Sequence, residues 1–412
     1  MNFIFKTAAR NVKRNKRRSL LAIISVTLAL TLIVFMQGFI GGILDSMVKN
    51  TTRNETGHIR ISTKKFKEKS KFMSVTENLQ EPDKIIGTIM ADRSISENIE
   101  LITERTNFGV LLSNEGNNKT AMAISGDSKK EKDLSMLYKS IKEGRYLENE
   151  REMIIGKGLA ETLKYKLGDE VKVMTQGADY ALHLRKFTIV GIFDTGLKTM
   201  DDNFFQIGLK DAQKLLRSDN SVQQIIIMLK DYKDSEKIAG FISMILKNDE
   251  LSVDTWTKIS SNYDYMEMVS GIYNWIYFII ALLGAFIIGN IMTMVVLERR
   301  HEIGILKSMG LKGREILMLF LTEGMIMGFL GSLVGTILGI IIISIINING
   351  LDLTKMLAGV KNFPVDNVIF FTISISSVMK SLLLGTLISS LVSILPSRRA
   401  AKMNVVDSIK VV

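Results

Sequence analysis

Four long apolar runs, each close to basic residues, constrain this chain more than any other feature. They occupy residues 19–43, 272–297, 316–346 and 376–395. A helix needs about 20 mostly apolar residues to cross a bilayer. The sequence therefore predicts an integral membrane α-helical bundle with four transmembrane helices. The first run is too long for a signal peptide and no small-residue cleavage motif follows it, so we expect it to remain as a signal-anchor.

The net charge of +11 is concentrated in short segments beside these runs. The basic segments are residues 1–18, 298–315 and 396–412, whereas residues 44–271 are close to neutral. Nucleic-acid binding would explain basic segments, but it would not explain their position beside apolar spans. The positive-inside rule explains both observations. We therefore expect cytoplasmic termini, a cytoplasmic 298–315 loop, and residues 44–271 and 347–375 on the outside, with no nucleic-acid partner.

Residues 44–271 are predicted to form a large extracytoplasmic α+β domain. Short alternating or continuously apolar runs between turn residues are typical of strands, and apolar spacing of three to four residues is typical of helices. Strands are expected at 58–62, 152–156, 170–174, 186–193 and 223–229, a hairpin across 100–125 with its turn near Gly116, and helices at 157–165, 211–217 and 235–249.

The sequence offers little support for catalytic chemistry. The segment GIFDTGLKT (191–199) comes nearest to a phosphate-binding loop, but Leu197 separates Gly196 from Lys198 and breaks the required G-K step. Neither a G-x-S-x-G nor an H-E-x-x-H motif occurs. The chain has no cysteine and only three widely spaced histidines, so we expect no metal site and no cofactor in this chain.

Two charged residues interrupt the apolar runs. Glu323 lies about two turns inside the third run, where a carboxylate is costly and should face the interior of the bundle. It is either a functional carboxylate or a polar packing contact near the interface, and the sequence leaves both interpretations open. Lys380 lies about one turn inside the outer end of the fourth run, and we interpret it as an anchor that reaches back to the interface.

A line of glycines marks the third run as a helix-contact face. Gly331, Gly335 and Gly339 recur every four residues, and Gly328 extends the line. Small residues at this spacing let helix backbones approach closely in a membrane. The third run is therefore predicted to be the packing centre of the bundle.

The 298–315 loop is too long for a tight turn and has its own apolar residues: Ile303, Ile305, Leu306 and Met309. This spacing predicts a short amphipathic helix along the membrane surface, ended by Gly310. Such a helix can be a simple interfacial element or a docking element for a cytoplasmic partner, and the spacing alone does not decide between them.

Several segments resemble one protein family. The segment ERRHEIGILKSMG (298–310) resembles the coupling segment of ABC transporter permeases of the MacB/FtsX-like superfamily. Residues 395–410 resemble the segment that closes those permeases, and residues 8–22 resemble their opening amphipathic helix. Residues 142–173 resemble a segment common across the superfamily, and residues 190–216 resemble the lipoprotein-releasing, LolC/LolE-type permeases more specifically.

The resemblance implies an order of parts and a set of coupling residues. The implied parts are a cytoplasmic amphipathic helix (1–18), the first span (19–43), a MacB-like periplasmic core domain (44–271), the second span (272–297), a coupling helix (298–315), the third span (316–346), a short outer loop (347–375), the fourth span (376–395) and a cytoplasmic tail (396–412). The implied ATPase-coupling residues are Glu298, Arg299, Arg300, His301, Glu302, Ile303, Gly304, Ile305, Leu306, Lys307, Met309 and Gly310.

The function that the resemblance implies is transport without catalysis in this chain. A cytoplasmic ABC ATPase dimer would bind ATP and Mg, and a second permease subunit, identical or homologous, would complete the complex in the bacterial inner membrane. The cargo would be a lipoprotein or a lipid-like molecule of the outer leaflet, with a periplasmic carrier chaperone as a further partner. Alternatives are a MacB-like efflux permease for peptides, antibiotics or lipids, a membrane-anchored scaffold or sensor, and a membrane-anchored hydrolase.

Overall fold

The computed structural model describes residues 2–69, 74–114, 116–260, 262–353, 365 and 368–403. Residues 354–364, 366 and 367 of the predicted 347–375 loop and the tail beyond residue 403 lie outside the described residues. The chain divides into a helical unit and an α+β unit, which we describe separately. The helical unit comprises Met1–Asp45, Met266–Leu353 and Asn367–Val412, and the α+β unit comprises Ser46–Tyr265 and Thr354–Asp366.

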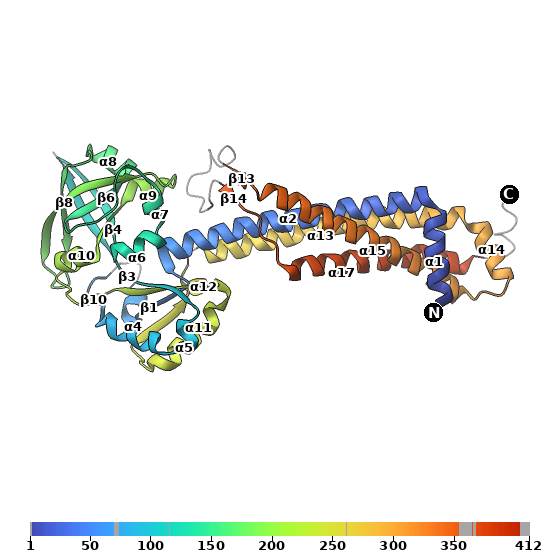
Figure 1. The fold of residues 1–412 in the computed structure, drawn as a ribbon, viewed down its shortest axis with the longest axis horizontal. Helices are drawn as coiled ribbons and strands as arrows, with labels where there is room; N and C mark the ends of the chain where they lie inside the picture. The colour runs from blue at the N-terminus through green and yellow to red at the C-terminus, as the bar shows by residue number, and fades with distance from the viewer. Residues whose placement is uncertain are drawn as a thin grey trace. The chain divides into compact units, whose positions relative to one another are not determined.

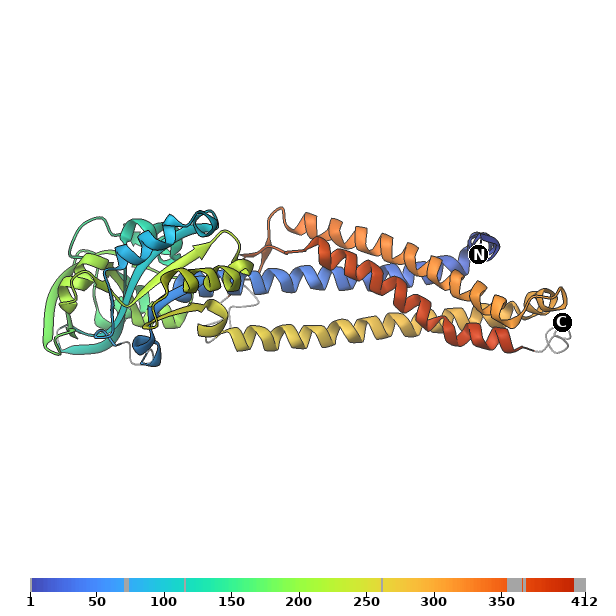
Figure 2. The same ribbon diagram turned by 90° about the horizontal axis from the view of Figure 1, so that it is seen from below.

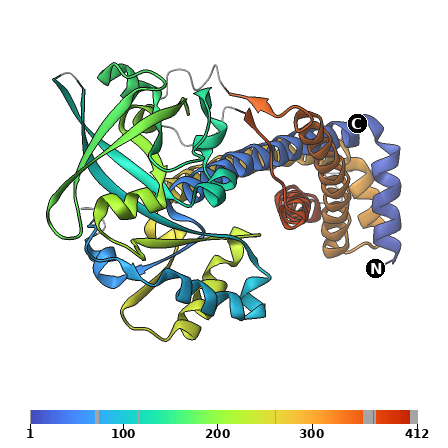
Figure 3. The same cartoon turned by 60° about the vertical axis from the view of Figure 1, so that its left-hand side comes forward.

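Four helices among the described residues are long and apolar enough to cross a membrane. Figure 1 shows them as α2 (Lys16–Thr51), α13 (Tyr263–Glu298), α15 (Gly313–Ile346) and α17 (Ile375–Val392), the last followed by α18 (Ile394–Lys402). The helix α1 (Asn2–Arg14) precedes α2 and packs against α15 (Figure 3).

Two of these helices extend by about two turns beyond the apolar runs that predicted them. The helix α2 continues to Thr51, beyond the predicted end at residue 43, and α13 begins at Tyr263, before the predicted start at residue 272. Hydropathy marks only the stretch that lipid can cover, whereas a helix continues as long as its backbone hydrogen bonds are made.

The glycine line of α15 packs against α2. A Cβ atom placed on Gly335 would lie 2.6 Å from the carbonyl oxygen of Thr27, so only glycine fits at this approach. The hydroxyl of Thr27 donates to the carbonyl oxygen of Gly331 at 3.2 Å, and that of Thr31 donates to the carbonyl oxygen of Gly335 at 3.1 Å. Close backbone approach thus brings interhelical hydrogen bonds with it.

The same helix packs against α17 through the glycines nearer its N-terminus. A Cβ atom on Gly328 would lie 2.4 Å from Cβ of Ser389, and one on Gly324 would lie 2.1 Å from Oγ of Ser393. Both serines are buried. The glycine line therefore serves two neighbouring helices, α2 and α17, and Figure 2 shows α15 in orange beside α17 in red.

We expect Gly335→Leu to destabilise the helical unit, because the new side chain overlaps the backbone of α2. Overpacking of this kind costs about 1–3 kcal/mol or more. Thermal unfolding of the purified chain in detergent measures the loss. Val334→Leu is the matched control, since Val334 is exposed on the same helix and should leave the unfolding midpoint nearly unchanged. Equal midpoints for the two variants would contradict this packing.

Three glycines of α2, which lie outside the glycine line of α15, bring this helix against an extended segment. A Cβ atom on Gly42 would lie 2.3 Å from the carbonyl oxygen of Phe370, and one on Gly41 would lie 2.6 Å from that of Thr372. The carbonyl oxygen of Gly38 accepts a hydrogen bond from the amide of Thr372 at 3.1 Å. This segment follows β14 (Val368–Ile369), which pairs with β13 (Leu351–Asp352) after α15.

In the α+β unit, ten strands of the described residues form one mixed sheet in the order β12-β1-β11-β3-β4-β9-β6-β8-β5, and β7 pairs with β3 and β8. The strands are β1 (Ile59–Thr63), β3 (Ile99–Asn114), β4 (Asn117–Gly126), β5 (Ile141–Gly144), β6 (Glu152–Gly156), β7 (Glu170–Gln176), β8 (Leu182–Phe193), β9 (Phe204–Gly208), β11 (Gln224–Leu229) and β12 (Leu251–Thr255). A separate pair consists of β2 (Leu79–Gln80) and β10 (Ser221–Val222).

Short helices cover this sheet over two apolar cores. One core lies around β1, β11 and helix α11, with Ile61, Ile227 and Ile242 fully buried. The other lies around β4, β7, β8 and β9, with Phe187 and Phe205 at its centre. The helices are α3 (Lys64–Glu68), α4 (Pro82–Ala91), α5 (Arg93–Ser96), α6 (Ser128–Leu134), α7 (Met136–Lys139), α8 (Lys157–Leu163), α9 (Lys198–Asn203), α10 (Leu209–Leu216), η3 (Tyr232–Asp234), α11 (Ser235–Leu246) and α12 (Trp256–Ile259).

The predicted secondary structure of this unit is largely confirmed. The strand at 152–156 has the predicted bounds, and the hairpin of β3 and β4 turns beside Gly116. The predicted strands at 170–174 and 186–193 lie inside the longer β7 and β8, which pair from Glu170 opposite Thr188 to Gln176 opposite Leu182. Both strands extend because their outer ends pair with each other, which single-strand patterns do not reveal.

Candidate functional site

The predicted coupling segment forms α14 (Arg300–Ser308), between α13 and α15. Ile303 is buried against the helical unit, whereas Ile305 is 42% exposed and Met309 is 73% exposed. The apolar residues that predicted an amphipathic helix therefore point in different directions. One side of α14 packs inward, and the other leaves apolar side chains uncovered.

Gly310 ends this segment in the left-handed conformation, with φ at +94°. Its amide donates to the carbonyl oxygen of Lys307, and the amide of Leu311 donates to that of Leu306 at 3.1 Å. These bonds satisfy carbonyls at the end of α14, and a glycine makes the turn without strain. The predicted stop at Gly310 is confirmed.

A buried ionic network holds the inner side of α14. The guanidinium Nη1 of Arg299 donates to both carboxylate oxygens of Glu323, at 3.0 and 3.1 Å, and Nε of Arg299 donates to Glu302 at 2.7 Å. Asn11 of α1 donates its side-chain amide to Glu323 at 2.7 Å. Glu323 is 3% exposed and Arg299 is 7% exposed. Three elements, α1, α14 and α15, thus share one buried carboxylate.

Outer members extend this network toward the surface. Arg14 donates to Glu302 at 2.6 Å, and Arg18 pairs with Glu298. These pairs are partly exposed, so each contributes little stability on its own. The guanidinium of Arg299 also lies 5.3 Å from the centre of the Phe320 ring, which shields the buried pair from one side.

A second connection joins α14 to α18. The ammonium of Lys307 donates to the carbonyl oxygens of Ala401 and Met403, at 2.7 and 2.5 Å. These carbonyls lie at the C-terminal end of α18, where a cation also interacts favourably with the helix dipole. Movement of α14 is therefore connected to α15 through Arg299 and to the last helices through Lys307.

The structure brings together only some of the twelve predicted coupling residues. Arg299, Glu302, Ile303, Gly304 and Lys307 form the inner side of α14 or its ionic contacts. His301, Ile305, Met309 and Gly310 are exposed, and so is Arg300. Sequence reasoning missed the parts of Asn11, Arg14 and Arg18, because no local pattern relates α1 and the start of α2 to a helix about 300 residues later.

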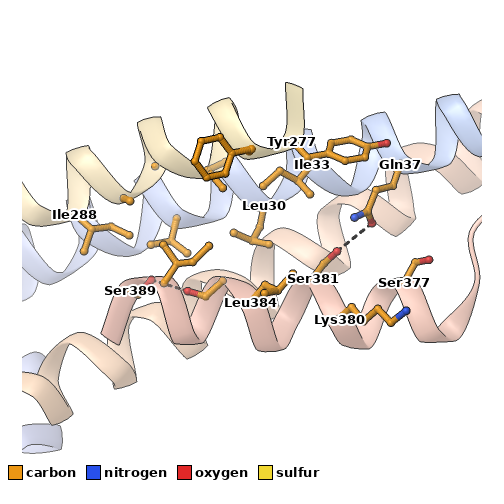
Figure 4. A pocket seen from close by; sticks show the side chains of 18 of the residues that line it. Leu30, Ile33, Gln37, Tyr277, Ile288, Ser377, Lys380, Ser381, Leu384 and Ser389 are labelled. Atoms are coloured by element: carbon orange, nitrogen blue, oxygen red, sulfur yellow. Dashed lines mark hydrogen bonds between the residues drawn. The ribbon is translucent and has the colours of Figure 1, made fainter. Parts of the chain in front are cut away.

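A cavity of about 450 Å³ opens between α2, α13 and α17 in the helical unit. Figure 4 shows Leu30, Ile33, Ile288 and Leu384 along its walls. Gln37, Tyr277, Ser377 and Lys380 gather at one end, where the side chain of Gln37 accepts a hydrogen bond from Ser381 at 3.0 Å. The cavity is thus mostly apolar, with polar groups near one end.

In the α+β unit, the C-terminal end of α2 is held by a fully buried ion pair. The helix ends in a π-helical turn, η1 (Thr52–Thr56). Arg105 of β3 donates to the carbonyl oxygens of Asn54 and Arg53 at 2.9 and 2.8 Å, and to both oxygens of Glu131 at 2.7 and 2.9 Å. Arg105 is 1% exposed and Glu131 is fully buried. This pair joins the helix end to the sheet.

The loop that came nearest to a phosphate-binding motif is already filled by a carboxylate. The amides of Thr195 and Gly196 donate to Asp201 at 2.9 and 3.1 Å. Amides that a phosphate would need are therefore engaged within the protein. Among the described residues, no group of three histidine, aspartate or glutamate side chains is arranged to hold a metal ion.

His58 should make the stability of the α+β unit depend on pH. Burial lowers the pKa of His58 to about 4, and the nearby charge of Arg53 acts in the same direction. Its Nδ1 accepts a hydrogen bond from the amide of Leu229 at 2.9 Å, which requires the neutral ring. Because an unfolded histidine has a pKa of ~6.5, the unfolded chain binds an extra proton between these two pKa values.

Neutral His58 therefore contributes to the free energy of unfolding. This contribution, roughly 3 kcal/mol, is fully present above pH ~6.5 and is lost as the pH falls toward 4. Urea unfolding of the purified chain at pH 7.5 and pH 5 measures it. His58→Gln should lower the free energy of unfolding at pH 7.5. It should also make that free energy depend less on pH between 7.5 and 5. A variant with the same pH dependence as the parent chain would show that another group is responsible.

Comparison with known proteins identifies both halves of the chain. Residues 19–242 match the MacB-like periplasmic core domain family, and residues 274–405 match the FtsX-like permease C-terminal family. The periplasmic region of MacB from Actinobacillus actinomycetemcomitans is a solved structure that covers 53% of this chain at 11% identity, with a TM-score of 0.36.

Curated relatives include the lipoprotein-releasing system transmembrane protein LolC of Neisseria meningitidis, 29% identical over 47% of this chain and 48% of that protein. An uncharacterized ABC transporter permease of Methanocaldococcus jannaschii is 29% identical over 66% of this chain and 65% of that protein. The macrolide export ATP-binding/permease protein MacB of Campylobacter jejuni is 27% identical over 58% of this chain and 36% of that protein.

The match to the first of these relatives spans about half of its length, and the match to the second about two thirds. The periplasmic core family alone covers more than half of this chain, and the permease family covers most of the remainder. Together with four membrane-spanning helices, these matches show that the chain belongs to the MacB/FtsX superfamily of ABC transporter permeases.

Proposed function

We propose that this chain is the permease subunit of an ABC transporter that releases lipoproteins, or closely related lipid-like cargo, from the outer leaflet of the bacterial inner membrane. A separate ATPase dimer supplies the energy, and a second permease, identical or homologous, completes the membrane part. Both termini and α14 face the cytoplasm, as the distribution of basic residues predicts. The relatives named LolC support this cargo.

The observation that carries the proposal is the two-sided character of α14. Its outer side presents Ile305 and Met309 to solvent, and exposed apolar side chains on a short helix favour contact with a partner protein. Its inner side is fixed to α15 by Arg299 and to α18 by Lys307. A partner that moves α14 therefore moves the spans with it, because helices transmit displacement as rigid elements.

The α+β unit receives movement through α2. The buried Arg105–Glu131 pair holds the end of that helix, so a displacement of α2 along its axis acts on β3 rather than being lost in a loose linker. No bond is made or broken in this chain during the cycle. Its residues bind, position and transmit, and the hydrolysis of ATP occurs in the partner.

Met309→Glu tests ATPase docking. Burying a new carboxylate in an apolar contact is costly, so we expect at least tenfold less ATPase to copurify with the variant. Ser308→Glu is the control for charge alone, because Ser308 is the exposed polar neighbour at the end of α14. Normal recovery of the ATPase with Met309→Glu would overturn the proposed docking surface and favour a scaffold or sensor without transport.

A MacB-like efflux permease is the second candidate, since the Campylobacter MacB protein matches 58% of this chain. The two candidates differ in cargo. Mass spectrometry of molecules that copurify with an ATP-locked complex distinguishes them. Acylated proteins would support lipoprotein release, whereas soluble peptides or macrolides would support efflux.

A further inference from the structure

We propose that the cavity between α2, α13 and α17 is a binding site for a single anionic phospholipid, with one acyl chain inside the cavity and the phosphate against Lys380. This inference requires only that the four apolar helices lie in a membrane. It does not depend on lipoprotein being the transported cargo.

The length and lining of the cavity fit an acyl chain. On α13 its lining residues run from Asn274 to Ile288, about 21 Å at a helical rise of 1.5 Å per residue. One leaflet of a bilayer is about 15 Å deep. The cavity is therefore long enough for one acyl chain with the start of its headgroup. Small residues, Ala281 and Gly284 among them, leave this space open along α13.

The polar groups lie at one end, as an amphiphile requires. Gln37 of α2, Tyr277 of α13 and Ser377 of α17 come together there (Figure 4). This is also the end at which α17 begins, with the side chain of Ser374 capping the amide of Ser377. The N-terminus of a helix carries partial positive charge, so a negative group is favoured at this end.

Lys380 decides the sign of the ligand's charge. It is the single charged side chain among the described residues that line the cavity. No carboxylate pairs with it in the described part of the chain. Its ammonium is exposed beside the cavity, so it attracts an anionic headgroup, whereas a zwitterionic headgroup brings its own cation. Lysine binds phosphate well as a compact point charge. The anionic amphiphile available in a leaflet is a phospholipid.

Native mass spectrometry of the full chain in neutral detergent tests this site without ATPase or cargo. The probes are phosphatidylglycerol and phosphatidylcholine with identical acyl chains. We expect phosphatidylglycerol to bind about fivefold more tightly than phosphatidylcholine, because the attraction of one lysine to an anionic lipid has about this effect on affinity. Lys380→Gln should remove this preference while phosphatidylcholine binding stays unchanged, and Lys380→Arg should keep it.

Ala281→Phe tests the acyl-chain part, because the ring fills the cavity from α13. It should weaken binding of both lipids at least fivefold. Leu383→Phe is the matched control, since Leu383 is exposed on α17 and does not line the cavity. Thermal unfolding in the same detergent shows whether each variant is folded.

Three results would overturn the inference: equal binding of the two lipids by the parent chain, an unchanged preference in Lys380→Gln, or unchanged binding in a folded Ala281→Phe. Copurification of the ATPase depends on α14 and is measured as a separate assay on these variants. Failure of the lipid site therefore leaves the proposed transport function standing, and failure of ATPase docking leaves the lipid site standing.

Discussion

Glu323→Gln is expected to abolish most of the proposed ATP-driven release while leaving the α+β unit folded. The glutamine keeps a polar partner for Asn11 but removes the charge that Arg299 binds in a bidentate contact. Arg299 is then a buried cation whose remaining carboxylate partner, Glu302, is partly exposed. Removing one member of a buried pair costs about 3–5 kcal/mol. We expect at least a tenfold loss of release per ATP hydrolysed by the reconstituted complex.

A double variant separates coupling from stability. Replacing both charges, as Arg299→Met with Glu323→Leu, leaves no unpaired charge but leaves the buried amide of Asn11 without its acceptor, so it should restore part of the thermal stability. It does not restore the connection between α14 and α15, so release should stay low. Normal release by the double variant would mean that the network serves folding alone.

Arg14→Ala is the matched control for the same network. Arg14 pairs with Glu302 where both side chains are about half exposed. Exposed pairs are worth about 0–1 kcal/mol, so this variant should change stability and release little. If Arg14→Ala causes a loss as large as that of Glu323→Gln, the pair of Arg14 with Glu302, and not the buried carboxylate, is the important contact.

Arg105→Met is expected to have the largest effect on the α+β unit. It leaves the carboxylate of Glu131 buried without its cation and leaves the carbonyl oxygens of Arg53 and Asn54 without their donor. The expected cost is about 3–5 kcal/mol for the broken pair. Thermal unfolding of the full chain should show a midpoint several degrees lower for this unit.

Two companions make the Arg105 result interpretable. Arg93→Ala breaks an exposed pair with Glu97 on a short helix and should cost less than ~1 kcal/mol. Arg105→Met combined with Glu131→Leu also removes the carboxylate that the single variant leaves unpaired, and it should recover part of the stability. A double variant that recovers nothing would show that the bonds to the end of α2, rather than the ion pair, account for the loss.

Glu323 shows what the structure adds to a question that the sequence left open. An intramembrane carboxylate predicted either a function or a packing contact. The structure gives it a defined partner set of Arg299 and Asn11, which lie 24 and 312 residues away in the chain. Hydropathy identified the unusual residue because a charge in an apolar run is costly, but it could not supply partners from other helices.

Lys380 shows the opposite case. Its place near the end of a span predicted an anchor, and that interpretation needs only the local sequence. The structure adds the cavity beside it, which exists because α2, α13 and α17 do not fill the space between them. A gap between three helices depends on their packing, and no single-helix pattern contains it.

The sequence by itself determined the four membrane-spanning helices, the α+β domain and the short helix α14, because each depends on local hydropathy, periodicity or a turn residue such as Gly310. The tertiary structure alone decided which sides of α14 are held and which are free, that the glycine line of α15 serves two helices, and that Arg105 holds the end of α2. These properties depend on contacts between residues far apart in the chain, where packing and desolvation, rather than local propensity, determine the free energy.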